Sequence, residues 1–265
     1  MIRPARACYF CGAVGGMSKE HVWPRWLREM SVDLTDSTTA WSSGFDITAP
    51  GKVIEAPLIQ TTKQGSPITA KVREVCRVCN FGWMSRLEQD VRPTIRRVTL
   101  ASFPIGVTTL GPEEACRLAV WALKSAWMRE LATPGHRTPT LEMRAYLKDQ
   151  LMPPANAQVW AARHAGQLDF HARTAQARIV HQDHAWDRGF ETRHALVCTL
   201  TFSRLSLLSV TTDGTGVPPM APDPSLWTPL WPFDGGVRWP PLESVSDTEV
   251  AAVTTHLGRW LRVLG

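Results

Sequence analysis

The chain has 265 residues, of which 44% are hydrophobic, and its formal net charge is +5. This length can bury a substantial core in one large domain or two smaller ones, and we expect two. The charge is uneven, because residues 1–110 hold 14 Lys and Arg against 9 Asp and Glu, whereas the remainder holds 15 of each. A basic segment favours a polyanionic partner, although a bias of this size is also common in ordinary domains.

No apolar run approaches the roughly 20 residues that cross a bilayer, and the first residues lack the apolar stretch of a secretion signal. The composition therefore excludes a membrane-spanning class, and we expect a soluble, cytoplasmic protein with no membrane partner. In a reducing compartment, paired cysteines bind metal more often than they form disulfides.

The first motif in the chain is a CxxC pair, Cys8 and Cys11, and a second pair follows at Cys76 and Cys79. Two intervening residues let both sulfurs of such a knuckle face one ion, and Gly12 allows the tight turn to close. The two pairs together predict a structural zinc ion held by all four cysteines. Disulfides or free buried thiols are the alternative.

Between the cysteine pairs, residues 53–60 and 67–75 have strand-like patterns and predict a hairpin. Residues 30–50 look like an added loop. After Cys79, apolar residues recur at spacings of three and four, which predicts an amphipathic helix that Pro93 bends or ends. The members of this apolar stripe are Trp83, Leu87, Val91, Ile95 and Val98.

Beyond this helix the pattern changes twice. Residues 112–131 and 141–151 predict two helices, and residues 157–212 then predict an antiparallel sheet of about four strands. These strands are expected at residues 158–166, 168–180, 193–202 and 205–212.

The tail that follows is rich in proline and tryptophan, and we expect irregular structure packed onto the core through its large aromatic side chains. These are Trp227, Trp231, Phe233 and Trp239. A last helix is predicted at residues 246–264, because Ser246 and Glu249 form an S/T-x-x-E capping box. Cys116 and Cys198 lie in apolar settings typical of core residues.

Lys19-Glu20-His21 lies between the cysteine pairs and is followed by Pro24, and Asn80 comes directly after the last cysteine. The order CxxC, then acid-His-x-x-Pro, then CxxC-Asn at a helix start resembles the HNH family of ββα-metal nucleases over about the first 95 residues. The resemblance implies that Glu20 and Asn80 bind a divalent ion, Mg²⁺ or Mn²⁺, and that His21 activates water.

The residue types agree with this chemistry independently. Phosphodiester hydrolysis needs a general base with a pKa near neutrality, which His21 supplies, and a hard cation that neutralises phosphate charge. Glu20 and Asn80 offer the oxygen ligands that such a cation takes. The sequence therefore favours a metal-dependent endonuclease that acts on nucleic acid, with DNA as the expected partner.

The sequence departs from the family pattern at several positions. Glu20 replaces the aspartate that many members carry, and the family's Asn before the second cysteine pair and its His or Asn one helical turn later are both missing. Glu88, two turns after Asn80 on about the same helix face, is a candidate for the missing metal ligand. Five basic residues near the motifs are candidates for phosphate contacts: Lys19, Arg25, Arg28, Arg77 and Arg86.

The predicted fold is α+β, in three segments. Residues 1–98 form a zinc-bound, HNH-like ββα-metal domain, residues 99–154 a helical connector, and residues 155–265 an antiparallel strand-rich domain with the tail and the terminal helix.

Two other functions remain open from the sequence. One is a non-catalytic, zinc-dependent module that binds nucleic acid or protein. In that case the missing metal-ligand position would indicate that catalysis has been lost. The other is an HNH-like fold with a small-molecule substrate, whose pocket the strand-rich C-terminal part would close. The twelve tryptophans could stack on bases, but such residues more often belong to the core.

Overall fold

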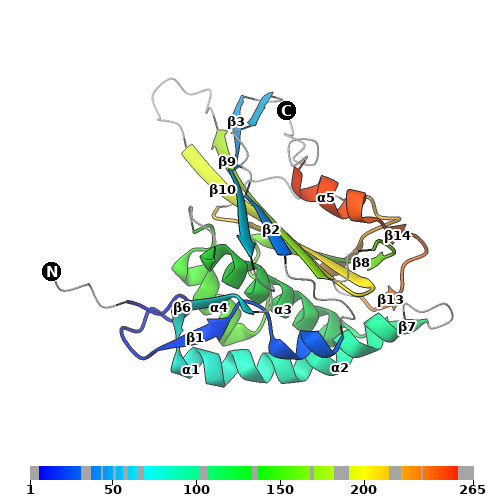
Figure 1. The fold of residues 1–265 in the computed structure, drawn as a ribbon, viewed down its shortest axis with the longest axis horizontal. Coiled ribbons are helices and arrows are strands. Elements are labelled where there is room, and N and C mark those ends of the chain that lie inside the picture. Colours follow the sequence, from blue (N-terminus) through cyan, green and yellow to red (C-terminus); the bar gives the residue numbers. More distant parts are fainter. Residues whose placement is uncertain are drawn as a thin grey trace.

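Helices and mainly antiparallel sheets build the molecule, so the predicted α+β class is confirmed (Figure 1). Helix α3 (Pro112–Leu131) lies on one face of a large sheet, and helix α5 (Asp247–Thr255) lies on the other. The computed structural model describes residues 6–30, 37–42, 44–49, 52–55, 59–64, 69–101, 107–132, 137–167, 170–181, 191–214, 222–233 and 235–255.

The large sheet contains the four strands expected between residues 157 and 212. They lie in the order β8 (Ala157–His164), β11 (Leu205–Thr212), β10 (Glu191–Phe202) and β9 (Phe170–His181), and all three pairings are antiparallel. Because β8 pairs with β11, the first and last of these strands in the sequence are neighbours. Beyond β8 lie β12 (Thr228–Trp231) and β14 (Ser244–Val245).

Strand β11 explains why this sheet is buried on both faces. All eight of its residues are buried, and alternate side chains point to opposite faces. Leu205 and Leu207 join the core that contains α3, whereas Leu208 and Val210 join a second core that contains Val250 of α5. A strand covered on both faces also buries its polar side chains, and the four hydroxyls of β11 are hydrogen-bonded: Ser206, Ser209, Thr211 and Thr212.

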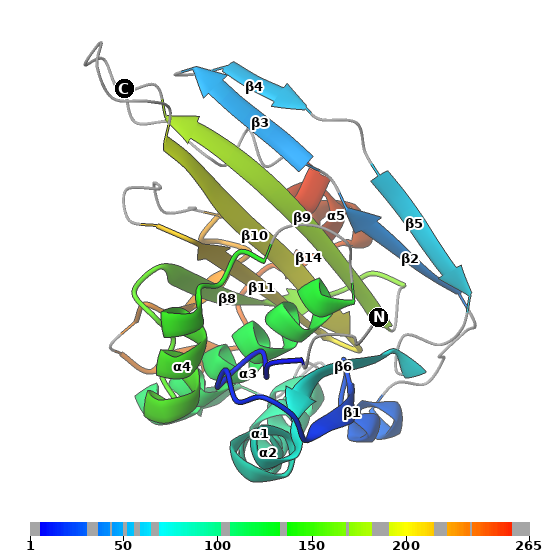
Figure 2. The ribbon, with the colours of Figure 1, turned by 90° about the vertical axis from the view of Figure 1, so that its left-hand side faces the viewer.

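The expectation that residues 30–50 form an added loop is wrong for the residues that the structure describes. Strands β3 (Gly44–Ala49) and β4 (Lys52–Glu55) extend the large sheet, with β3 parallel to β9 (Figure 2). Strands β2 (Ser37–Ser42) and β5 (Ile59–Gln64) form a separate antiparallel pair.

The predicted hairpin is wrong in its pairing. Strand β6 (Lys71–Cys76) pairs antiparallel with β1 (Met17–His21), with a register shift between Ser18 and Glu20. The partner of β6 therefore lies about 50 residues earlier in the chain. A local pattern predicts that a segment is a strand but contains no information about which distant segment completes it.

The helix after β6 runs from α1 (Arg77–Cys79) through the π-helical segment η3 (Asn80–Met84) into α2 (Ser85–Ala101). Pro93 lies inside α2 without ending it. The predicted apolar stripe is confirmed, because all five of its members are buried: Trp83, Leu87, Val91, Ile95 and Val98.

The other predicted helices are also present. Helix α3 has the predicted bounds, and α4 (Leu141–Gln150) begins after the N-cap Thr140 and ends before Leu151, whose φ is 49°. The predicted capping box of α5 is confirmed, since Ser246 N–H donates to Glu249 Oε2 at 2.6 Å and Glu249 N–H donates to Ser246 Oγ at 3.3 Å. Residues 256–264 of this predicted helix lie outside the described residues.

The tail contains more regular structure than its prolines suggest, because β12 pairs with β8, and β13 (Val237–Trp239) pairs with β7 (Thr108–Leu110). Trp227 and Trp239 are buried as expected, whereas Phe233 is 39% exposed. One further short helix, η1 (Arg25–Glu29), follows β1.

A single hydrophobic core draws on all three predicted segments. Phe10 and Ile95 from the first segment, Trp121 from the second, and Leu207 and Trp239 from the third belong to it. The segments thus share their interior, and their boundaries stay a prediction. Among the helices of the described residues, none is both long and apolar enough for a membrane span.

Glu130 of α3 joins distant parts of this core. It is fully buried, and its carboxylate accepts hydrogen bonds from Tyr9 Oη at 3.2 Å, Thr138 N–H at 2.9 Å and Gln176 Nε2 at 3.2 Å. Burial raises the pKa of this carboxyl, and the hydrogen bonds from Thr138 and Gln176, with the charge of Arg137, oppose the shift. Tyr9 lies between the first two cysteines, so Glu130 fixes the cysteine loop to α3 and β9.

We therefore expect Glu130→Ala to lower the free energy of unfolding by about 2–4 kcal/mol, because it leaves buried donors without an acceptor. Glu130→Gln keeps one oxygen for the donors and removes the buried charge, so its loss should be smaller. Urea unfolding at neutral pH measures both. Equal losses for the two variants would contradict this account.

Candidate functional site

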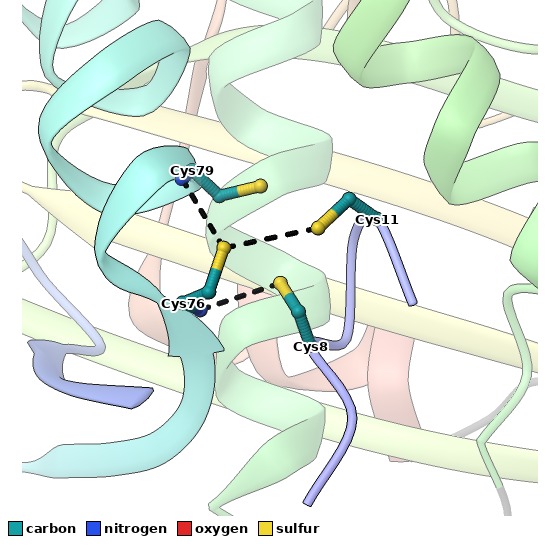
Figure 3. A group of neighbouring side chains, drawn as sticks. All are labelled: Cys8, Cys11, Cys76 and Cys79. Carbon is teal, nitrogen blue, oxygen red and sulfur yellow. Dashed lines mark hydrogen bonds between the residues drawn. The ribbon is translucent and has the colours of Figure 1, made fainter. Parts of the chain in front are cut away.

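The sulfur atoms of Cys8, Cys11, Cys76 and Cys79 lie within 4.8 Å of one another (Figure 3). Tetrahedral zinc with Zn–S bonds of about 2.3 Å requires sulfurs about 3.8 Å apart. The Cys11 and Cys76 sulfurs are separated by 3.7 Å. The four thiols therefore fit a structural metal such as zinc. The six cysteines are free of disulfides.

Backbone hydrogen bonds prepare these sulfurs for metal binding. Cys76 N–H donates to Cys8 Sγ at 3.3 Å, and Cys79 N–H donates to Cys76 Sγ at 3.4 Å. Burial opposes ionisation of Cys8, but the backbone donors bring the pKa of its thiol down to about 7. Gly12 has a φ of 71° and its N–H donates to Cys8 O at 2.8 Å, which closes the knuckle turn as predicted.

A pocket of about 460 Å³ lies at the junction of β1, η1 and the helix that follows β6. Glu20, His21, Asn80 and Glu88 all line it. The structure thus brings together the three residues proposed for catalysis and the candidate replacement ligand. The pairing of β1 with β6 contributes to this arrangement, because it sets Met17 at the start of β1 opposite Cys76, and Asn80 of the following helix bonds Ser18 of β1.

Hydrogen bonds hold Asn80 in this position. Asn80 Nδ2 donates to Ser18 Oγ at 3.0 Å, and Ser18 Oγ donates to Val75 O at 3.0 Å. A further side-chain hydrogen bond joins Asn80 to Glu20. The amide donors are directed at β1, and the amide oxygen is the atom that a cation would take.

The pocket shifts the titration of both residues of the acid-His pair. Burial and the nearby Glu88 carboxylate raise the pKa of Glu20 to about 7, against the opposing effects of Lys124 and Asn80. Burial, with the positive charges of Lys71 and Arg25, lowers the pKa of His21. A carboxyl whose pKa is raised in this way gains from the additional positive charge that a bound cation would supply.

Arg25 determines which nitrogen of His21 can take up a proton. Its Nε donates to His21 Nε2 at 3.3 Å, and a guanidinium can only donate. The imidazole is therefore neutral with its lone pair on Nε2, in the protonation state that a general base requires.

Lys124 of α3 is the charged neighbour of this site that the sequence analysis missed. Its side chain is fully buried, and its Nζ lies 2.5 Å from Glu88 Oε1. The sequence does contain a signal for this residue, because Lys124 interrupts an otherwise apolar stretch of helix. A lysine in such a stretch needs an acidic partner when it is buried. One carboxylate oxygen of Glu88, Oε1, thus contacts Lys124, and the other, Oε2, can serve as a ligand in the pocket.

The five basic residues proposed for phosphate contacts are all exposed, and Arg25 is the one that lines the pocket. Lys19, Arg28, Arg77 and Arg86 lie outside the pocket lining, so their contact with nucleic acid stays a prediction.

Within the described part of the chain, the cysteine cluster is the one group of three or more His, Cys, Asp or Glu side chains with mutually close ligand atoms. At the pocket, the donors for a cation are the oxygens of Glu20, Asn80 and Glu88. Carboxylate and amide oxygens suit Mg²⁺ or Mn²⁺, which retain several water ligands.

A scan against protein-family models and searches of curated proteins and of solved structures found no match to this chain. Its function is therefore argued from the residues of the site.

The cysteine cluster predicts that the purified protein contains one zinc ion per chain. Cys76→Ser should lose the zinc and unfold at lower temperature, because structural zinc contributes directly to folding free energy. Elemental analysis and thermal unfolding measure both effects. Cys116→Ser, outside the cluster and half-buried, is the matched control and should retain its zinc. Equal zinc content in both variants would exclude the four-thiol site.

The Lys124–Glu88 pair predicts a second measurable effect. Lys124→Met should destabilise the fold by about 3–5 kcal/mol, because it leaves the partly buried carboxylate of Glu88 without its counter-charge. Adding Glu88→Gln should recover part of this loss, and a double-mutant cycle from urea unfolding quantifies the coupling. Additive losses in the cycle would show that the two side chains do not interact.

Proposed function

We propose that this protein is a zinc-stabilised, metal-dependent endonuclease of the HNH type that hydrolyses phosphodiester bonds in DNA. The observation that carries the proposal is that Glu20, His21 and Asn80 line one pocket, and that Asn80 directly follows Cys79 of the four-cysteine cluster. These are the residues that the sequence resemblance selects, and they come from segments about 60 residues apart.

The backbone around the pocket supports the same proposal. Strands β1 and β6 are antiparallel and lead into the helix that begins at Arg77, which is the order that the ββα name describes. His21 ends the first strand, and Asn80 lies in the first turns of the helix. The cysteine cluster stands at the point where strand and helix meet.

His21 acts as the general base in the proposed reaction. Its neutral imidazole accepts a proton at Nε2 from the attacking water, and Arg25 leaves this nitrogen to make room for that water. Arg25 is exposed and has the reach to do so. As a guanidinium it can then contact the phosphate, where its donors suit the oxygens of a phosphodiester.

Glu20 and Asn80 would hold Mg²⁺ or Mn²⁺, which supplies charge neutralisation at the scissile phosphate. Glu88, whose carboxylate Lys124 holds in place, contributes a further negative charge to the same pocket. When ionised, Glu20 and Glu88 carry two negative charges, and Lys124 carries one positive charge, so the net charge of the three is −1. This charge suits one bound dication better than two.

The pocket lining bears on the alternative of a small-molecule substrate. All its residues come from positions 20–29 and 80–88, and the large sheet contributes none of them. A cavity closed by the strand-rich part, as that alternative requires, is therefore not supported by the described residues. The alternative of a non-catalytic nucleic-acid-binding module is distinguished by the assay below.

The decisive assay incubates plasmid and single-stranded DNA with the zinc-loaded protein in Mg²⁺ or Mn²⁺. Cleavage should fall by about 10²–10⁴-fold in His21→Ala, the usual contribution of a general base. Glu20→Gln should also lose activity, with a larger loss at low metal concentration. Glu142→Gln changes an exposed carboxylate of α4 outside the pocket and serves as the matched control.

Zinc content and thermal unfolding establish that each variant is folded. Metal-dependent cleavage that survives in His21→Ala would refute the assigned base. DNA binding without cleavage by the wild-type protein would favour the binding module.

A further inference from the structure

Phe81 is an exposed aromatic residue at the edge of the proposed active site. Its side chain is 73% exposed, it lines the pocket, and it follows Asn80 directly in the sequence. A single exposed apolar residue is ordinary on a protein surface. This one differs in its position, because it lines the same pocket as His21 and Asn80.

The local backbone accounts for this orientation. Residues Asn80–Met84 form a π-helical segment, in which Gly82 has non-helical angles of φ −89° and ψ −111°. Cys79, Trp83 and Leu87 are buried at helical spacing, so Phe81 lies on the opposite, outward side of the helix. An added Cβ at Gly82 would meet nothing within 4 Å, so close packing does not require glycine there. Such π-bulges are frequent at functional sites.

The remaining pocket residues indicate what the ring would contact. His21, Arg25, Glu20 and Asn80 provide a place for a phosphodiester, and Phe81 provides an apolar face next to it. A nucleotide combines these two chemistries, since it joins a phosphate to a flat base, and aromatic side chains stack on bases with little sequence preference.

The exposed face of the ring favours an unpaired base over a paired one. The pocket beside it has a volume of about 460 Å³, which falls in the range of small-ligand sites. A base in a duplex is already stacked and paired, so its face is not available to a side chain at the phosphate.

We propose that Phe81 is a stacking platform for an unpaired base next to the scissile phosphate, and that the protein therefore acts on single-stranded or locally unpaired DNA. This inference rests on the proposed nuclease function and specifies its substrate class. Stacking makes Phe81 a binding and specificity residue, separate from the proton transfer at His21.

The test measures binding in a His21→Ala background, so that the DNA stays intact. Fluorescence anisotropy in Mg²⁺ measures binding of a labelled single strand and of the matched blunt duplex. Three proteins are compared: the one that retains Phe81, Phe81→Ala and Phe81→Trp. Loss of the ring should weaken single-strand binding by about 5- to 100-fold, and tryptophan should restore it. Duplex binding should change by less than about twofold, because it does not use the stacking interaction.

Val78→Ala is the matched control. Val78 is 82% exposed on the same helical segment, but it does not line the pocket. Its removal should leave single-strand binding unchanged. A fluorescent adenine analogue placed at successive positions should be quenched at one position by the Phe81 protein and not by Phe81→Ala.

The possible results separate the inference from the proposed function. If His21-dependent cleavage is present but Phe81→Ala binds single strands as Val78→Ala does, the nuclease stands and the stacking role is refuted. If the wild-type protein cuts no DNA but single-strand binding depends on the ring, the nuclease proposal fails and the stacking platform is supported. Preferred binding of the blunt duplex would refute the substrate class.

Discussion

The pocket depends on one local constraint, the convergence of four cysteine sulfurs where β6 turns into its helix. Cys8 and Cys76 are separated by more than 60 residues, and closing so long a loop has an entropic cost that weak surface contacts do not offset. A zinc ion held by four thiolates would offset it, because metal binding adds directly to the free energy of folding. With the cysteines joined, the helix start that carries Asn80 lies against β1, and the acid-His pair meets it there.

The cysteine cluster is supported by the body of the protein. Tyr9, inside the first knuckle, donates to the buried Glu130, and Arg144 of α4 stacks 4.1 Å from the Tyr9 ring centre while donating to Tyr9 O. Helix α3 also provides Lys124, which sets the charge of the pocket through Glu88. The N-terminal segment therefore owes both its position and its electrostatics to elements that follow it in the chain, which is why one core joins them.

The charges of the pocket suit the proposed chemistry in a specific way. Burial disfavours the charged forms of Glu20 and His21 alike, which leaves a neutral base beside a carboxyl that gains most from a cation. Phe81 adds an apolar face to this polar site. A site of this kind would recognise a nucleotide by its general chemistry rather than by base sequence.

Much of the molecule follows from local sequence. The CxxC spacing predicted the cysteine cluster, and apolar periodicity predicted α2. Start residues and composition predicted α3, flanking breaks predicted α4, and the β-like runs from Ala157 onward predicted four strands. All of these signals depend on residues close together in the sequence. Only the tertiary structure decided the partner of β6, the addition of β3 to the large sheet, and the place of Lys124 behind Glu88. These features depend on segments that meet after long loops close, and neither periodicity nor residue type records which distant segment will supply the missing hydrogen bonds or counter-charge.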